Sequence, residues 1–141
     1  MRSLRRCRLW GSALPLHAAA APRAILSCYS DEEISNYIAL ASPMRQRTGL
    51  TLPAKRLWGE IKKIRREGCS WSIPEYVPND VQHISFPVKD MFERPHGAIN
   101  ISGSSENFSE KIGSLSEPIR KLVAEFNAHS RTLAAIQSTL Q

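Results

Sequence analysis

The sequence has no apolar run that approaches the roughly 20 residues needed for a helical bilayer span, so we expect no membrane partner. Cysteine is also scarce. Cys7, Cys28 and Cys69 are an odd number and lack CxxC spacing, which fits neither a disulfide framework nor a zinc site. This cysteine usage indicates a reducing, cytoplasmic setting.

The signatures of common catalytic and metal chemistry are missing as well. The sequence contains no phosphate-binding loop and no GxGxxG, HExxH, GxSxG or EF-hand pattern. Its four histidines are far apart and show no metal-ligand spacing. No histidine stands next to Cys28 or Cys69 to act as a base for a thiol nucleophile. We therefore predict no catalytic residue, no metal site, no cofactor and no enzyme activity.

The positive charge is distributed unevenly along the 141 residues. The net charge is +6, but residues 1–30 contain five arginines and no acid, so the remainder carries 14 basic and 13 acidic residues. A nearly neutral body has no general need for a polyanionic partner. An arginine-rich leader is nevertheless typical of organelle targeting peptides, and a basic organelle-targeted or nucleic-acid-associated subunit remains the alternative interpretation.

Four segments have helical periodicity or helix-start signals. Ser30 and Glu33 form a capping-box pattern, and Gly68 is a typical helix stop. A basic face at residues 55–66 is typical of a solvated helix surface. The expected helices are Leu16–Leu26, Ser30–Ala41, Thr51–Gly68 and a last one from about Glu117, with Pro118 in its first turn.

After Gly68 the apolar period changes from 3.6 to 2, which predicts strands. The expected strands are Cys69–Ile73, Val81–Val88 and Gly97–Ser102, with turns at 78–80 and 93–97 and a break at 103–105. Helices around a meander of antiparallel strands define an α+β fold.

Polar side chains gather on one predicted face of this sheet. His83, Asn100 and Ser102 alternate with apolar residues on their strands, and Ser72 precedes the turn. Small neutral donors and acceptors beside apolar residues are typical of a small-molecule pocket. The solvent-facing side of an antiparallel sheet gives the same pattern, and the residues alone do not separate the two interpretations.

Several short blocks, in order and at matching spacing, resemble the effector-binding domain of IclR-type bacterial transcriptional regulators. The resemblance covers about Leu14 to Ala134. The blocks are Pro15-Leu16-His17-Ala18, Ala24-Ile25-Leu26, Arg65-Arg66-Glu67-Gly68-Cys69-Ser70, Glu75, Pro87-Val88 and Ile99-Asn100-Ile101-Ser102-Gly103.

The resemblance implies a GAF/profilin-like antiparallel sheet with helices packed on it, which binds a small metabolite and assembles as a homodimer or tetramer. No segment here resembles the family's winged helix-turn-helix. We therefore expect an N-terminally truncated regulator that does not bind DNA directly. The expected organisation is a basic leader at 1–13, the effector-binding domain at 14–134 and a tail at 135–141.

The resemblance also implies a binding site. The family's ligand-contacting positions fall on Ser72, His83, Asn100 and Ser102, with Ala21 on the alanine-rich helix. An acid, a cysteine and a serine are usual at the first three, and a glycine is usual at Pro22. Losing an acid and gaining an imidazole makes the pocket less negative, so we expect a small organic-acid ligand.

Overall fold

The computed structural model describes residues 14–41, 51–73 and 81–139 of the chain. Its elements, in order, are α1 (Ala20–Leu26), α2 (Asp31–Leu40), α3 (Ala54–Glu67), β1 (Ser70–Trp71), β2 (Val81–Lys89), β3 (Pro95–Ser104) and α4 (Ser105–Thr139). The strands form one antiparallel sheet in the order β1-β2-β3. The predicted α+β class is confirmed, whereas the expectations for residues 1–13, Glu75 and the turn at 78–80 lie outside the described residues.

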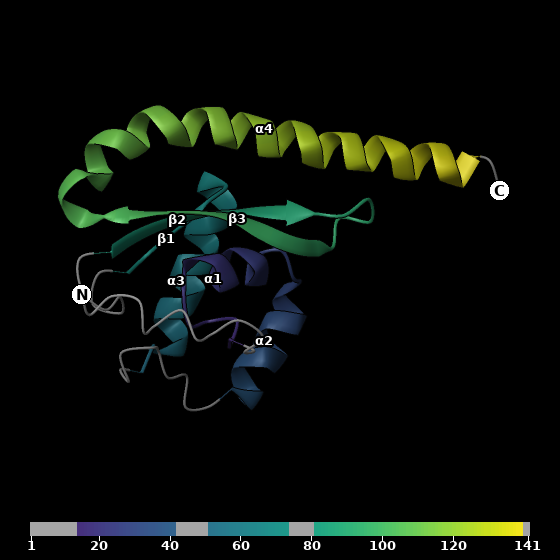
Figure 1. Cartoon of the computed structure of the whole chain (residues 1–141). Coiled ribbons are helices and arrows are strands. Elements are labelled where there is room, and N and C mark those ends of the chain that lie inside the picture. The colour runs from purple at the N-terminus through teal and green to yellow at the C-terminus, as the bar shows by residue number, and fades with distance from the viewer. Residues whose placement is uncertain (1–13, 42–50, 74–80, 140–141) are drawn as a thin grey trace.

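The sheet is covered on both faces. Helix α4 runs along one face, and α1 packs on the other with α2 and α3 beyond it (Figure 1). Each side has its own apolar core. The core between the sheet and α4 is formed by Cys69, Ile84, Phe86, Phe108, Ile112 and Val123. The core among the first three helices is formed by Leu26, Ile34, Leu52, Leu57, Ile61 and Ile73.

Local signals set both bounds of α2 and the end of α3 as predicted. The predicted starts of the first and third helices are too early, because α1 begins at Ala20 and α3 at Ala54. The Ser30 hydroxyl accepts a hydrogen bond from the Glu33 amide at 3.2 Å, and the Glu33 carboxylate accepts one from the Ser30 amide at 2.9 Å. This reciprocal capping box satisfies two amides at the start of α2. Helix α3 ends at Gly68, whose φ of 73° is readily available to glycine.

The predicted start of the last helix is wrong. Helix α4 begins at Ser105 directly after β3, and Pro118 lies inside it instead of in its first turn. The predicted strand break at 103–105 is also wrong, because β3 continues to Ser104 and α4 begins at the next residue. Phe108 and Ile112 are buried against the sheet, and this packing stabilises a helix that begins directly at the end of β3. The Phe108 ring lies so close to Gly103 that a Cβ there would come within 2.7 Å of it.

The predicted turn at 93–97 is too long, because β3 already begins at Pro95. Proline is tolerated at the first residue of an edge strand, where its missing amide removes no ladder hydrogen bond. The turn is instead closed by Asp90, whose carboxylate accepts hydrogen bonds from the Phe92 and Arg94 amides at 2.8 and 2.9 Å. Strand β1 is shorter than predicted, and β2 extends to Lys89.

Candidate functional site

Strand register places the predicted polar residues on one face of the sheet. Ser85 pairs with Ser70 of β1 and with Asn100 of β3, and His83 pairs with Ser102. Ser72 extends the row, since its amide donates to the His83 carbonyl at 2.9 Å. The alternation predicted for β2 and β3 is therefore confirmed. This set is the polar face of the sheet: Ser70, Ser72, His83, Ser85, Asn100 and Ser102.

Hydrogen bonds connect the side chains of the polar face. Asn100 Nδ2 donates to Ser102 Oγ at 2.8 Å, and Asn100 Oδ1 accepts from Ser85 Oγ at 2.5 Å. Ser102 Oγ lies 2.8 Å from His83 Nδ1. Ser72 Oγ accepts from the His83 amide at 3.0 Å. Four of the five predicted site residues thus belong to one connected network.

The network runs from the interior to the surface. Ser70, Ser72 and Ser85 are buried, His83 is half-buried, and Asn100 and Ser102 are exposed. Helix α1 packs on the strands from this side, and its Ala20 and Ala24 are buried. Small side chains on both surfaces allow the helix to approach the sheet closely. Ala21, the fifth predicted residue, is half-buried on α1.

The directions of these hydrogen bonds determine which donors and acceptors remain available at the exposed end of the network, at Asn100 and Ser102. Ser102 Oγ accepts from Asn100 and lies within hydrogen-bond distance of His83 Nδ1. When the ring proton of neutral His83 is on Nε2, the Ser102 hydroxyl donates to Nδ1. When His83 is protonated, Nδ1 becomes a donor to Ser102, and the Ser102 proton is released for another acceptor. A positively charged ring and a hydroxyl donor then stand side by side.

Arg23 is a structurally important residue that the sequence analysis did not single out. Its side chain is 1% exposed and donates to the carbonyls of His17 at 3.3 Å and Trp71 at 3.0 Å. Burial lowers the pKa of Arg23 to about 10, and the nearby Glu60 carboxylate opposes this effect. Arg23 thereby ties α1 to β1. A single arginine within an alanine-rich apolar segment was the available signal.

Two buried polar atoms near this junction have no hydrogen-bond partner among the described residues, Arg23 Nε and Ser70 Oγ. Buried polar groups are rarely left unpaired in native structures. Ser70 belongs to the polar face, and Arg23 holds the helix that covers it. The α1–sheet junction therefore has unsatisfied hydrogen-bonding capacity, as does Arg120 Nε on α4.

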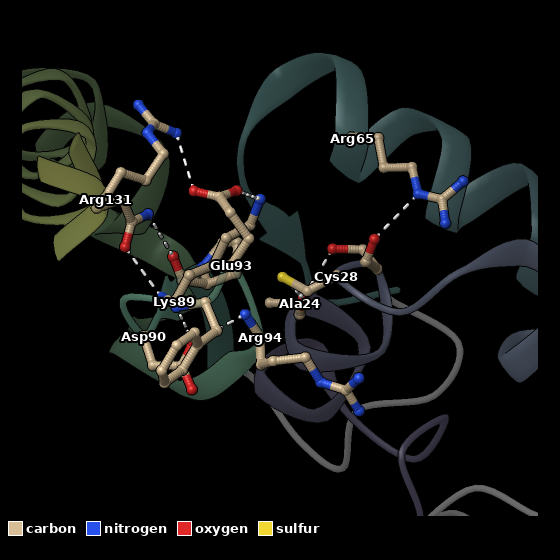
Figure 2. A network of polar contacts seen from close by, with 12 residues as sticks. Ala24, Cys28, Arg65, Lys89, Asp90, Glu93, Arg94 and Arg131 are labelled. Atoms are coloured by element: carbon tan, nitrogen blue, oxygen red, sulfur yellow. Dashed lines mark hydrogen bonds and ion pairs between the residues drawn. The ribbon is translucent and has the colours of Figure 1, made fainter. Parts of the chain in front are cut away.

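A separate cleft of about 270 Å³ lies among α1, α3, β2 and α4. Its lining includes Arg65, Lys89 and Arg120 but none of the five predicted site residues. All three cations already have protein partners. Arg65 donates to the Ser27 and Tyr29 carbonyls and pairs with Asp31. Arg120 donates to the Glu67 carbonyl. Lys89 pairs with Glu93 of the β2–β3 hairpin (Figure 2). These cations stabilise helix ends and the hairpin.

The remaining groups with chemical potential are the described thiols and the side chains that can ligate a metal. Burial raises the pKa of both the Cys28 and the Cys69 thiol, which disfavours the reactive thiolate. Within the described ranges, no three His, Cys, Asp or Glu side chains are grouped so that they could hold a metal ion. None of the described helices combines the length and apolar character of a bilayer span.

Comparison with solved structures shows which known folds the chain resembles. The chain resembles Thermotoga maritima IclR at 25% identity and a TM-score of 0.66, covering 84% of this chain and 47% of that one. It resembles the Agobacterium tumefaciens repressor BlcR at 22% identity and a TM-score of 0.65, covering 83% and 47%. A PobR inducer-binding domain from Acinetobacter, a double mutant in complex with 3-hydroxybenzoic acid, matches at 20% identity and a TM-score of 0.62, covering 85% and 67%. These relatives are transcriptional regulators.

The family follows from the sequence itself. Residues 1–128 match the model of the bacterial transcriptional regulator IclR C-terminal domain. The chain therefore belongs to the IclR family, within the C-terminal regulatory domain. No curated protein matches the sequence closely. The chain spans about half the length of the first full-length regulators it resembles.

Proposed function

We propose that this chain is the effector-binding domain of an IclR-type regulator and that it binds a small organic anion at the open end of the polar face. The observation that carries the proposal is the Asn100–Ser102–His83 hydrogen-bond network, whose exposed end presents donors next to a titratable ring. The structural neighbour PobR, which holds a hydroxybenzoic acid, supports an aromatic or aliphatic carboxylate as the ligand class.

Each predicted residue has a separate role in this proposal. Protonated His83 supplies positive charge, and Ser102 and Asn100 supply hydrogen bonds to the carboxylate. Ser72 fixes the position of His83 through the His83 amide. Ala21 belongs to α1, which covers the polar face and contributes apolar contact to the ligand body.

The proposal includes no catalysis and needs no cofactor. Binding shifts the population of conformations of a regulator, which requires only differential affinity. We further propose that the domain acts in the cytoplasm as a homodimer or tetramer, and that this chain by itself does not read DNA, which requires an element in a groove. The organisation into residues 1–13, 14–134 and 135–141 belongs to the same proposal.

Calorimetric titration of the full chain with acetate, benzoate and 3-hydroxybenzoate tests the ligand class. We expect at least one carboxylate to bind, and we expect His83→Ala and Asn100→Ala each to weaken it about 10-fold or more, since each removes a hydrogen bond to a charged group. His96→Ala is the matched control, because His96 is an exposed histidine on β3, the strand that also carries Asn100.

Two results would overturn this proposal. One is the absence of binding by every carboxylate tested. The other is binding of equal strength by the His83, Asn100 and His96 variants, which would place the ligand away from the polar face.

A further inference from the structure

Helix α3 concentrates the positive charge of the folded body. It carries six cations and two acids, whereas the rest of residues 31–141 carries eight basic and eleven acidic residues. The near-neutral body therefore consists of a basic helix and an acidic remainder. An uneven distribution of this kind can direct a charged partner to one surface even when the net charge is small.

Four of these cations share one exposed side of α3, opposite the apolar side that is buried in the core. At 3.6 residues per turn they fall within a sector of about 100° and extend over about 16 Å of the helix. We call Lys55, Lys62, Lys63 and Arg66 the α3 basic face. Arg66 pairs with the adjacent Glu67, and the three lysines form no salt bridge with another described residue.

Gly59 falls in the middle of the α3 basic face. Glycine inside a helix is destabilising relative to alanine, yet the φ of Gly59 is not positive, and a Cβ there would meet no neighbouring group within 4 Å. Lys62 and Arg66, four residues apart, also repel each other. Local features that cost stability without a structural return are expected at functional surfaces. The bare backbone at Gly59 allows a bulky anion to approach between the cations.

The chemistry of this surface favours a duplex nucleic acid over other polyanions. A membrane-binding helix inserts its apolar side, but the apolar side of α3 is buried in the core. Single strands bind by stacking on aromatic side chains, and Trp58, the one aromatic residue of α3, is half-buried against that core. A duplex presents its phosphates without unstacked bases. Because the chain belongs to a family of transcriptional regulators, the duplex that its assembly meets is DNA.

We propose that the α3 basic face binds the phosphate backbone of duplex DNA, with the backbone of one strand passing over Gly59. Phosphate contacts position a protein on a duplex but carry no sequence information. Such binding therefore does not read an operator, and it differs from the expectation of no direct DNA binding only in this sequence-independent contact. The polar face takes no part in it, so carboxylate binding and DNA binding can each fail without the other.

Fluorescence anisotropy of a labelled DNA duplex, titrated with the full chain at a series of salt concentrations, tests the surface. We expect salt-sensitive binding, and we expect Lys62→Ala combined with Lys63→Ala to weaken it at least ~10-fold and to reduce the salt slope by about two. Lys111→Ala combined with Lys121→Ala is the matched control. It removes the same charge from exposed positions of α4 and leaves the affinity and the slope unchanged.

Gly59→Glu separates loss of contact from loss of structure. Glutamate is a better helix former than glycine, so α3 keeps its helical circular dichroism and its thermal stability. The new carboxylate stands in the middle of the α3 basic face, and we expect it to weaken DNA binding at least ~10-fold through repulsion of the phosphates.

Three results would overturn the proposal. The first is a wild-type chain that does not bind the duplex at low salt. The second is equal binding by the α3 variants and the α4 control, which would assign the contact to another segment such as the arginines of residues 1–30. The third is tighter binding of a labelled polyglutamate than of DNA, which would indicate an acidic protein partner.

Discussion

The Ser85 hydroxyl donates a 2.5 Å hydrogen bond to the side-chain oxygen of Asn100 across the β2–β3 pair. Ser85 is fully buried under α1, whereas Asn100 is exposed at the open end of the polar face. A buried donor thus orients an exposed amide, so that its nitrogen points toward Ser102. The ligand-facing geometry depends on a residue that a ligand at the open end does not reach.

Replacing Ser85 tests this orientation. We expect Ser85→Ala to weaken carboxylate binding by about 3–10-fold and to lower the free energy of unfolding by about 1 kcal/mol, since one hydrogen bond is lost. Ser85→Thr restores the hydroxyl and recovers most of the affinity. Calorimetry and urea unfolding measure the two effects. Full affinity in Ser85→Ala would show that Asn100 needs no such support.

Removing the Arg23 side chain tests the tie between α1 and β1. Arg23→Ala leaves the His17 and Trp71 carbonyls without their donor, and we expect a loss of about 2–4 kcal/mol in the free energy of unfolding. Arg66→Ala is the control, because Arg66 is exposed and pairs only with the adjacent Glu67 among the described residues, and it costs less than about 0.5 kcal/mol. Equal effects of the two substitutions in urea unfolding would refute the structural role of Arg23.

Substitution of Gly103 tests its close contact with the Phe108 ring, which helps to determine where α4 begins. We expect Gly103→Ala to destabilise the chain by about 1–3 kcal/mol, because the new methyl group meets the Phe108 ring. Gly97→Ala, on the same strand, meets no atom within 4 Å and serves as the control. Thermal unfolding compares the two variants. A Gly103 variant as stable as the Gly97 variant would mean that α4 does not pack on β3 at this point.

The pKa values of two surface carboxylates, Glu33 and Glu93, predict how the free energy of unfolding changes in acid. Hydrogen bonds from the Ser30 amide and hydroxyl, together with Arg94, lower the pKa of Glu33, and Lys89 and Arg131 lower the pKa of Glu93, each from the ordinary value of 4.5. Both pKa values are lower in the folded state than in the unfolded state. The ionised carboxylates therefore stabilise the fold fully above pH 4.5, and this stabilisation is lost as the pH falls through their pKa values in the folded state. Glu33→Gln with Glu93→Gln should flatten this acid limb of the stability profile. An unchanged profile would show that these contacts do not stabilise the fold.

Local signals in the sequence predicted much of the fold. The Ser30 capping box, the Gly68 stop and the alternation around Asn100 each depend on neighbouring residues alone, and the structure confirms them. The start of α4 was not predictable in this way, because it depends on Phe108 packing over the sheet. The proline at 118 had indicated a helix start, yet tertiary contacts carry the helix through it.

In the candidate site, too, some features follow from neighbouring residues and others from tertiary contacts. Alternation predicted that His83, Asn100 and Ser102 share a face, and strand register confirms it. The role of Ser85 in orienting Asn100, and that of Arg23 in holding α1, depend on contacts between segments distant in sequence. The sequence can single out Arg23 as an isolated arginine in an apolar segment, but it contains no local signal for the distant residues that Arg23 and Ser85 contact.

The most direct test of the central claim is ¹⁵N NMR of the histidine rings during titration with a carboxylate that binds. The account predicts that saturation moves the His83 ring nitrogens toward the protonated form, with Nδ1 donating to Ser102, while the His96 signals stay in place. Unchanged His83 nitrogens at saturation, or a shift confined to another histidine, would contradict a binding site on the polar face.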